Sequence, residues 1–325
     1  MAPCSEVRLE AATALGLGRR ERQEDAVLCD VPRGGAAGIV VLADGLGGHT
    51  GGEVASRLAV STALRELAGH RDAEGALAGD IPALLRVAAE AANHAVLAQA
   101  EQAPEVAGMG TTLLVAVVQA GALWWISVGD SPLFVLREGR LRQLNETHAL
   151  ATHLDLLVEV GEMAPEEAAA HPARSCLTSA LGADPIERID CPDGPFALRP
   201  GDVVMAASDG LLTLAPEEIG AIAGGAGMRS ADLAGGLLDA VMRAGVREQD
   251  NVSLAVLRAE AAASVRPAGR GLRTALRRLL GGLGGAVPGR APVREPVREP
   301  VRGPVPGPVP GPAPAAARSA LEPSE

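Results

Sequence analysis

The sequence of 325 residues contains no lysine and no tyrosine, and it has only two tryptophans and two phenylalanines. All 29 basic residues are therefore arginine, a bias that is typical of GC-rich genomes and says little about function. The four cysteines, Cys4, Cys29, Cys176 and Cys191, form no C-x-x-C pair, which argues against a structural zinc site or a thioredoxin-like motif. They indicate isolated thiols in a reducing compartment.

Targeting signals are missing as well. The first residues lack the basic and then apolar pattern of a signal peptide. No apolar run approaches the roughly 18 residues that a membrane-spanning helix needs. We therefore expect a cytoplasmic protein without a membrane span.

The net charge of −11 is unevenly distributed along the chain. Residues 261–325 carry ten arginines and four glutamates, whereas residues 1–260 carry 36 acidic residues against 19 arginines. An acidic body of this kind argues against nucleic acid as a main partner. Acidic residues also gather where divalent cations bind, although a solvated acidic surface is the commoner reason.

The composition changes near residue 260, which predicts two regions. Residues 1–260 alternate strand-like apolar runs with alanine-rich stretches and are long enough to bury a sizeable core. Residues 261–325 are rich in arginine, proline and glycine and repeat every four residues in "PVREPVREPVRGP", so we expect a disordered, extended tail. Within the tail, residues 271–280 form either a solvated connector or a short basic helix that docks on acidic lipid or on a partner.

The hydrophobic patterns of residues 1–260 predict an α+β layered fold. Strands occur in neighbouring hairpin-like sets and long helices are inserted as pairs, unlike the regular alternation of a doubly wound sheet. The expected strands cover residues 7–15, 25–30, 38–44, 111–119, 123–129, 133–137, 202–207 and 252–258. The expected helices cover residues 52–67, 81–99, 165–170 and 230–244.

Five carboxylates stand where these expected strands begin or end. "IVVLAD" ends in Asp44, "WWISVGD" in Asp130 and "VVMAASD" in Asp209, while Asp25 and Asp250 open the runs that follow them. Strand ends present side chains to a site from a rigid scaffold. If the five acids converge, their charges require either protonation or bound cations. No His or Cys recurs beside them, and an oxygen-only ligand set suits Mg²⁺ or Mn²⁺ better than zinc or copper.

The glycine-rich stretch "ADGLGGHTGG" around Asp44 leaves three alternatives open: a phosphate-binding loop, a metal site or a plain turn. A single Asp-Gly favours a turn, whereas five acids beside strongly apolar strands favour metal binding. A nucleotide-phosphate loop has little support, because the stretch lacks G-x-x-x-x-G-K-[ST] and no G-x-G-x-x-G opens a helix there.

Seven stretches along the chain form an ordered set: "RRERQEDAV", "ADGLGGHTGGEVAS", "GMGTTLLVAVV", "VGDSPLFVLREGRLRQLNETHA", "HPARSCLTSALG", "ASDGLLT" and "DNVSLAVL". They resemble, in this order, the motifs of the metal-dependent protein phosphatase family (PPM, the type 2C Ser/Thr phosphatases), and the bacterial branch is the closer match. The resemblance covers residues 7–258. It implies a β-sandwich of two antiparallel sheets flanked by pairs of helices.

The resemblance also implies two bound ions, Mn²⁺ or Mg²⁺, with oxygen ligands from Asp25, Asp44, the carbonyl group of Gly45, Asp209 and Asp250. Asp130 would share a third ion with Asp209. Glu24 would hold a metal-bound water, and Arg20 would bind the substrate phosphate with its fork of donors.

The implied activity is hydrolysis of phosphoserine and phosphothreonine in proteins. A water molecule that bridges the two ions is acidic enough to ionise near neutral pH and would attack phosphorus in line, without a covalent intermediate. The expected partners are phosphorylated proteins, with a cognate Ser/Thr kinase as a further candidate by family analogy. The proline-rich tail would tether the protein to a partner that recognises extended segments.

The chain departs from the family pattern at several positions, of which Pro132 and Thr147 are implied by the resemblance to lie near the rim of the site. Leu46 stands where many members carry the histidine that acts as general acid, which leaves His49 or a metal-bound water as the proton donor. Pro132 and Thr147 replace a usual arginine and a usual aspartate. These changes motivate an alternative, a pseudophosphatase that binds phosphoproteins without hydrolysis, against which the complete acid set weighs heavily. Residues 149–182 are expected to be either a plain surface loop or a flap that screens substrates.

Overall fold

A computed structural model describes residues 7–32, 34–46, 51–225 and 227–261. The chain separates into two units, Met1–Ser264 and Val265–Glu325, and every described residue belongs to the first unit. The possible helix at residues 271–280, the proline-rich tail and His49 lie outside the described residues. The division of the chain near residue 260 therefore stays a prediction.

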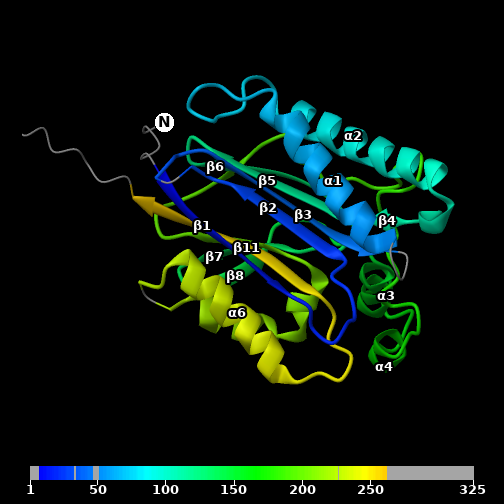
Figure 1. Ribbon diagram of the computed structural model, residues 1–325. Helices are drawn as coiled ribbons and strands as arrows, with labels where there is room; N and C mark the ends of the chain where they lie inside the picture. Colours follow the sequence, from blue (N-terminus) through cyan, green and yellow to red (C-terminus); the bar gives the residue numbers. More distant parts are fainter. Residues whose placement is uncertain (1–6, 33, 47–50, 226, 262–325) are drawn as a thin grey trace, which may run out of the picture. The chain divides into compact units, whose positions relative to one another are not determined.

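Two antiparallel β-sheets lie face to face at the centre of the first unit (Figure 1). The first sheet has the order β1-β11-β10-β7-β8, with β1 (Val7–Gly16), β11 (Val252–Ala261), β10 (Val203–Ala207), β7 (Leu133–Arg137) and β8 (Arg140–Gln143). The second has the order β2-β3-β5-β6-β9, with β2 (Asp25–Asp30), β3 (Gly38–Leu46), β5 (Leu113–Gln119), β6 (Ala122–Val128) and β9 (Phe196–Ala197). The short strand β4 (Gly110–Thr111) pairs with β3. The expected sandwich is confirmed.

Strand β3 shows why the inner strands are apolar on both faces. Val40 and Leu42 point into the core between the two sheets, whereas Ile39, Val41 and Ala43 point into the core under the helices. Successive side chains of a strand point to opposite faces of its sheet, so a strand that is covered on both sides needs apolar residues at every position. The run that precedes Asp44 is therefore a consequence of double burial.

Helix pairs cover the outer faces of the sandwich (Figure 1). Helices α1 (Gly51–Ala68) and α2 (Ile81–Gln102) pack on each other and on the second sheet. Helices α5 (Pro216–Ala223) and α6 (Ser230–Ala244) cover the first sheet, and α3 (Leu150–Glu159) packs on α4 (Pro165–Ala169). No helix within the described ranges is long and apolar enough to cross a membrane.

Among the helices and strands, the sequence patterns missed α3, α5, β8 and the two-residue strand β9. Helix α3 carries apolar residues at helical spacing, Leu150, Leu154, Leu157 and Val158, a signal that was overlooked, although only Leu154 is fully buried. Helix α5 does carry a start signal, with Pro216 in its first turn followed by two glutamates, which was overlooked. Strand β3 continues past its expected end because Gly45 and Leu46 pair with β4. Asp44 therefore lies inside a paired strand and not in a loop.

Candidate active site

The predicted site residues, apart from Asp25, line one cavity of about 250 Å³: Arg20, Glu24, Asp44, Gly45, Asp130, Asp209 and Asp250. The cavity is also lined by Leu46, by Thr112 and Asn251, and by Ser175 and Leu177 from the segment that follows α4. These residues come from both sheets and from the loop between β1 and β2. Four of the five strand-end acids, Asp44, Asp130, Asp209 and Asp250, therefore converge on this cavity, which is the condition that the sequence analysis posed.

Asp25 lies directly behind the cavity wall. It is the first residue of β2, it stands opposite Asp44 in the antiparallel pairing of β2 with β3, and only 3% of its surface is exposed. Its Oδ2 accepts a hydrogen bond of 2.7 Å from the hydroxyl group of Ser208, whose oxygen accepts the backbone N–H of Ser253 at 2.9 Å. Its Oδ1 is buried and has no hydrogen-bond partner in the described part of the chain. A buried carboxylate oxygen left unpaired in this way is suited to a cation.

Asn251 holds the β1–β2 loop against the site. Its Oδ1 accepts the backbone N–H of Glu24 at 2.7 Å, and its Nδ2 donates to the carbonyl groups of Leu17 and Arg22. The loop thereby presents Arg20, whose Nη2 lies 2.6 Å from the Oδ2 of Asp250. Because both side chains of this pair are about half exposed, the guanidinium group can exchange the carboxylate for a ligand from solvent at little cost.

Asp130 and Asp209 enter the cavity from the ends of two further strands. Asp130 follows β6, and the turn that carries it requires Gly129 at a φ of +105°, a conformation that side chains disfavour. The backbone N–H of Gly129 donates to Nδ1 of the buried His148 at 3.2 Å, and the backbone N–H of His148 donates to the carbonyl group of Gly129 at 2.9 Å. Asp209 follows β10 and opens the short 3₁₀ helix η2 (Asp209–Thr213).

Burial and mutual repulsion raise the pKa values of these carboxyl groups. Burial raises the pKa of Asp25 to about 6, with a further contribution from the charges of Asp209 and Asp250. Burial and the charge of Asp209 raise the pKa of Asp130 to about 7. The pKa of Asp44 lies well above its usual value, from burial and then the charge of Asp25, and burial also raises the pKa of Asp209.

Glu24 belongs to the same group of perturbed acids. Burial raises the pKa of its carboxyl group, and the charge of Arg20 opposes this effect. Such a concentration of destabilised negative charge is the condition that bound cations relieve.

The donor set suits Mg²⁺ or Mn²⁺, because it consists of carboxylate and carbonyl oxygens. Gly45 keeps the backbone open at this point: a Cβ atom added there would lie 2.1 Å from the carbonyl oxygen of Gly52. Nowhere in residues 7–32, 34–46, 51–225 and 227–261 does a group of three or more His, Cys, Asp or Glu residues form a ready-made metal site. The fit therefore rests on the unpaired oxygen of Asp25, the raised pKa values and the chemistry of the donors.

Several residues that support the site were missed in the sequence. Thr112 receives the backbone N–H of Asp44, Ser208 donates to Asp25, and Asn251 anchors Glu24. Each lies in one of the recognised motifs, and two of them stand next to a predicted acid, as Ser208-Asp209 and Asp250-Asn251. Their position beside the acids was the signal that could have revealed them.

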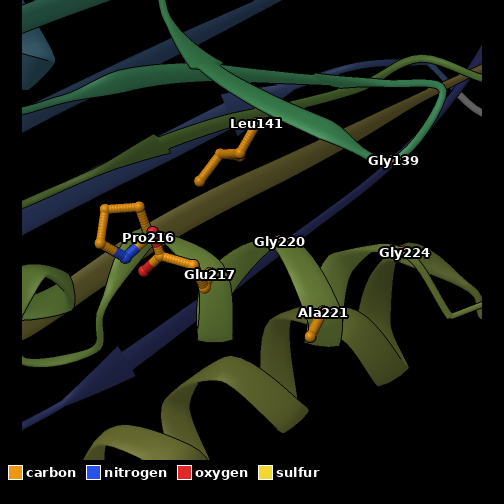
Figure 2. A pocket seen from close by; sticks show the side chains of 7 residues that line it. All are labelled: Gly139, Leu141, Pro216, Glu217, Gly220, Ala221 and Gly224. Carbon is orange, nitrogen blue, oxygen red and sulfur yellow. The ribbon is translucent and has the colours of Figure 1, made fainter.

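A larger hollow of about 610 Å³ lies elsewhere, between the β7–β8 hairpin and α5 (Figure 2). It is lined mainly by small or apolar residues, among them Leu141, Pro216 and Gly220, and Glu217 is its one acidic lining residue. It contains none of the predicted site residues, so size does not identify the candidate site in this protein.

Comparison with known proteins connects this arrangement to one family. Residues 17–213 match the family model described as Protein phosphatase 2C. The chain is 38% identical over 193 residues to a serine/threonine protein phosphatase PstP of Mycobacterium tuberculosis. The aligned region covers 59% of this chain and 34% of the relative. It is 36% identical over 182 residues to a serine/threonine phosphatase stp of Listeria welshimeri. This aligned region covers 55% of this chain and 68% of the relative.

A solved structure agrees with these sequence matches. The catalytic domain of a serine threonine protein phosphatase PstP, crystallised in complex with 2 manganese ions, matches with a TM-score of 0.63 and 31% sequence identity. The match covers 78% of this chain and 99% of that chain. The chain spans about a third of the length of the mycobacterial relative and about two thirds of the Listeria relative. The family expected from the seven motifs is confirmed: this chain belongs to the protein phosphatase 2C family.

Proposed function

We propose that the protein hydrolyses phosphoserine and phosphothreonine in proteins and that it depends on Mn²⁺ or Mg²⁺. One observation carries the proposal: buried carboxylates with raised pKa values and the accessible guanidinium group of Arg20 share a single cavity. The relatives named as serine/threonine phosphatases and the manganese complex support it.

Each predicted residue has a role that its position supports. Asp25, Asp44, Asp209 and Asp250 would hold two ions together with the carbonyl group of Gly45, and Asp130 would contribute to a third. Glu24, anchored by Asn251, would orient a water molecule. Arg20 would leave Asp250 and place two donors on the phosphoryl oxygens of the substrate.

Bound divalent ions would supply an acidic bridging water for in-line attack on phosphorus and would neutralise charge on the phosphoryl oxygens. The chain supplies the rest of the environment. The cavity, which Ser175 and Leu177 also line, would accept the phosphorylated side chain of the substrate. Leu46 also lines the cavity, so this side chain offers no proton to the departing alkoxide.

The decisive experiment is hydrolysis of phosphoserine and phosphothreonine peptides by the purified full chain, with and without Mn²⁺. We expect turnover with Mn²⁺ and none in EDTA. Asp209→Asn should abolish turnover, and circular dichroism should show that the variant is folded. Full activity in EDTA, or none with Mn²⁺, would refute the proposal; tight binding of Mn²⁺ and of phosphopeptide without turnover would instead establish the pseudophosphatase.

The remaining parts of the proposal concern partners. Phosphorylated proteins, and a cognate kinase among them, are the expected substrates, and the tail at residues 261–325 is expected to bind a separate partner. Removing residues 262–325 should leave peptide hydrolysis unchanged if the tail only tethers the protein. A large fall in kcat on removal would contradict this division of roles.

A further inference from the structure

Thr112 lies between two acids of the site, Asp44 on β3 and Asp130 after β6, which come from different parts of the second sheet. It is 1% exposed and interrupts the chain between β4 and β5, so its backbone is free to bond outside the regular ladder. It lines the cavity together with Asp44 and Asp130. It contacts the backbone of Asp44 and the two residues that flank Asp130, Gly129 and Ser131.

The contact with Asp44 is reciprocal. The N–H of Asp44 donates to Oγ1 of Thr112 at 2.9 Å, and the N–H of Thr112 donates to the carbonyl oxygen of Asp44 at 2.8 Å. The neighbouring Thr111 adds a hydrogen bond from its hydroxyl group to the same carbonyl oxygen at 2.8 Å. The backbone of Asp44 is therefore held at both its N–H and its C=O group.

The contact with the Asp130 turn involves the residues on either side of the acid. The hydroxyl groups of Thr112 and Ser131 are 2.9 Å apart and form a buried hydrogen bond. The methyl group of Thr112 packs against Gly129, where an added Cβ atom would lie only 2.6 Å from it. One side chain thus touches the residue before Asp130 with its methyl group and the residue after it with its hydroxyl group.

We propose that Thr112 is a positioning residue that sets the spacing between Asp44 and Asp130 before a divalent cation binds. The hydroxyl group does this, because its oxygen bonds both segments: it accepts the N–H of Asp44 and pairs with the hydroxyl group of Ser131. The inference rests on the proposed metal site, and it assigns to Thr112 no direct contact with substrate. Replacing a group that orients metal ligands typically lowers metal affinity by about 10- to 100-fold.

Four variants separate the hydroxyl group from the rest of the side chain. Thr112→Val keeps the branched shape and removes the hydroxyl group, whereas Thr112→Ser keeps the hydroxyl group and removes the methyl group. Ser131→Ala leaves the bond to Asp44 and removes only the link to the Asp130 turn. Thr62→Val is the matched control, since Thr62 is also a buried threonine but lies on α1, away from the cavity lining.

Mn²⁺ binding to the full chain is measured by electron paramagnetic resonance, and the thermal unfolding midpoint is measured in EDTA. We expect Thr112→Val and Ser131→Ala each to weaken Mn²⁺ affinity by about 10- to 100-fold. Thr112→Ser and Thr62→Val should bind Mn²⁺ as the wild-type protein does. The double variant Thr112→Val with Ser131→Ala should be no weaker than Thr112→Val alone, because both changes break the same link.

Equal Mn²⁺ affinity in wild type, Thr112→Val and Ser131→Ala would overturn the inference, as would a loss in Thr112→Ser as large as that in Thr112→Val. If Thr112→Val does not fold, Ser131→Ala decides alone. Because binding is measured without turnover, a wild-type protein that binds Mn²⁺ but hydrolyses no phosphopeptide would refute the proposed function and leave this inference standing. A wild-type protein that binds no Mn²⁺ would refute both.

Discussion

Replacing Asp130 with asparagine should stabilise the protein when no metal is bound. Burial and the charge of Asp209 raise the pKa of Asp130 from 3.8 to about 7 in the folded chain. The folded protein therefore retains a proton that the unfolded chain has released between these two values, so folding loses stability as the pH rises through this window. Asparagine keeps the shape of the side chain and has no charge to bury.

The size of the effect follows from the shift. One pKa unit corresponds to about 1.4 kcal/mol, so the ionised carboxyl group costs about 4 kcal/mol at a pH above 7. At about pH 5 the same linkage predicts that the Asp130 carboxyl group lowers the free energy of unfolding by about 1.7 kcal/mol. The advantage of Asp130→Asn over wild type should therefore widen by about 2.5 kcal/mol between about pH 5 and about pH 7.5.

The assay is urea unfolding in EDTA at the two pH values, followed by the fluorescence of the two tryptophans. Asp239→Asn makes the same chemical change at an exposed position on α6 and should alter the free energy of unfolding by less than about 0.5 kcal/mol at either pH. Excess Mn²⁺ should stabilise the wild type more than Asp130→Asn. The reasoning would be refuted if the difference in free energy of unfolding between Asp130→Asn and wild type stays constant or narrows as the pH rises. The ionised carboxyl group would then carry no burial penalty.

Three further predictions concern other parts of the site. Arg20→Ala should lower kcat/KM for a phosphopeptide by about 100-fold while Arg19→Ala, its exposed neighbour, has little effect; equal losses would argue against a phosphate-binding role. Gly45→Ala should destabilise the protein by about 3 kcal/mol or more in urea unfolding, because the added carbon would lie 2.1 Å from a carbonyl oxygen of α1. Gly194→Ala, where an added carbon meets nothing within 4 Å, is the control, and similar losses at both positions would contradict this. Ser208→Ala should reduce Mn²⁺ affinity about tenfold in calorimetry, since it removes the donor to the buried carboxylate of β2; unchanged affinity would show that the hydrogen bond is dispensable.

The acid set illustrates what a sequence pattern can anticipate. Asp44, Asp130 and Asp209 each follow a strongly apolar run, and burial on both faces of a strand produces such a run wherever the strand lies in a covered sheet. It was therefore reasonable to expect from the sequence alone that the three acids lie near one another. The order of the motifs also led to the family, which the comparisons confirm.

The surroundings of Asp44 show where the pattern was insufficient. The glycines after it indicated a loop, yet β3 continues to Leu46 because β4 supplies hydrogen-bond partners from a segment far along the chain. Helix α3 was also missed, although Leu150, Leu154 and Leu157 recur at the spacing of a helix. Contacts between distant segments overrode local preference at Asp44, whereas in α3 the local signal was present and was overlooked.

The sequence by itself determined which chemical groups are available: an oxygen-only set of acids beside apolar strands, arginines ahead of them, and no thiol or histidine among the candidate ligands. It also determined the layered α+β fold, because strand and helix periods are local properties of the chain. Only the tertiary structure decided which hydrogen bonds hold those acids, since Ser208 meets Asp25 across 183 residues and Asn251 meets Glu24 across 227. It likewise decided that the ionised forms of these carboxyl groups are destabilised. Their raised pKa values depend on burial and on neighbouring charges, which come together only when both sheets have assembled.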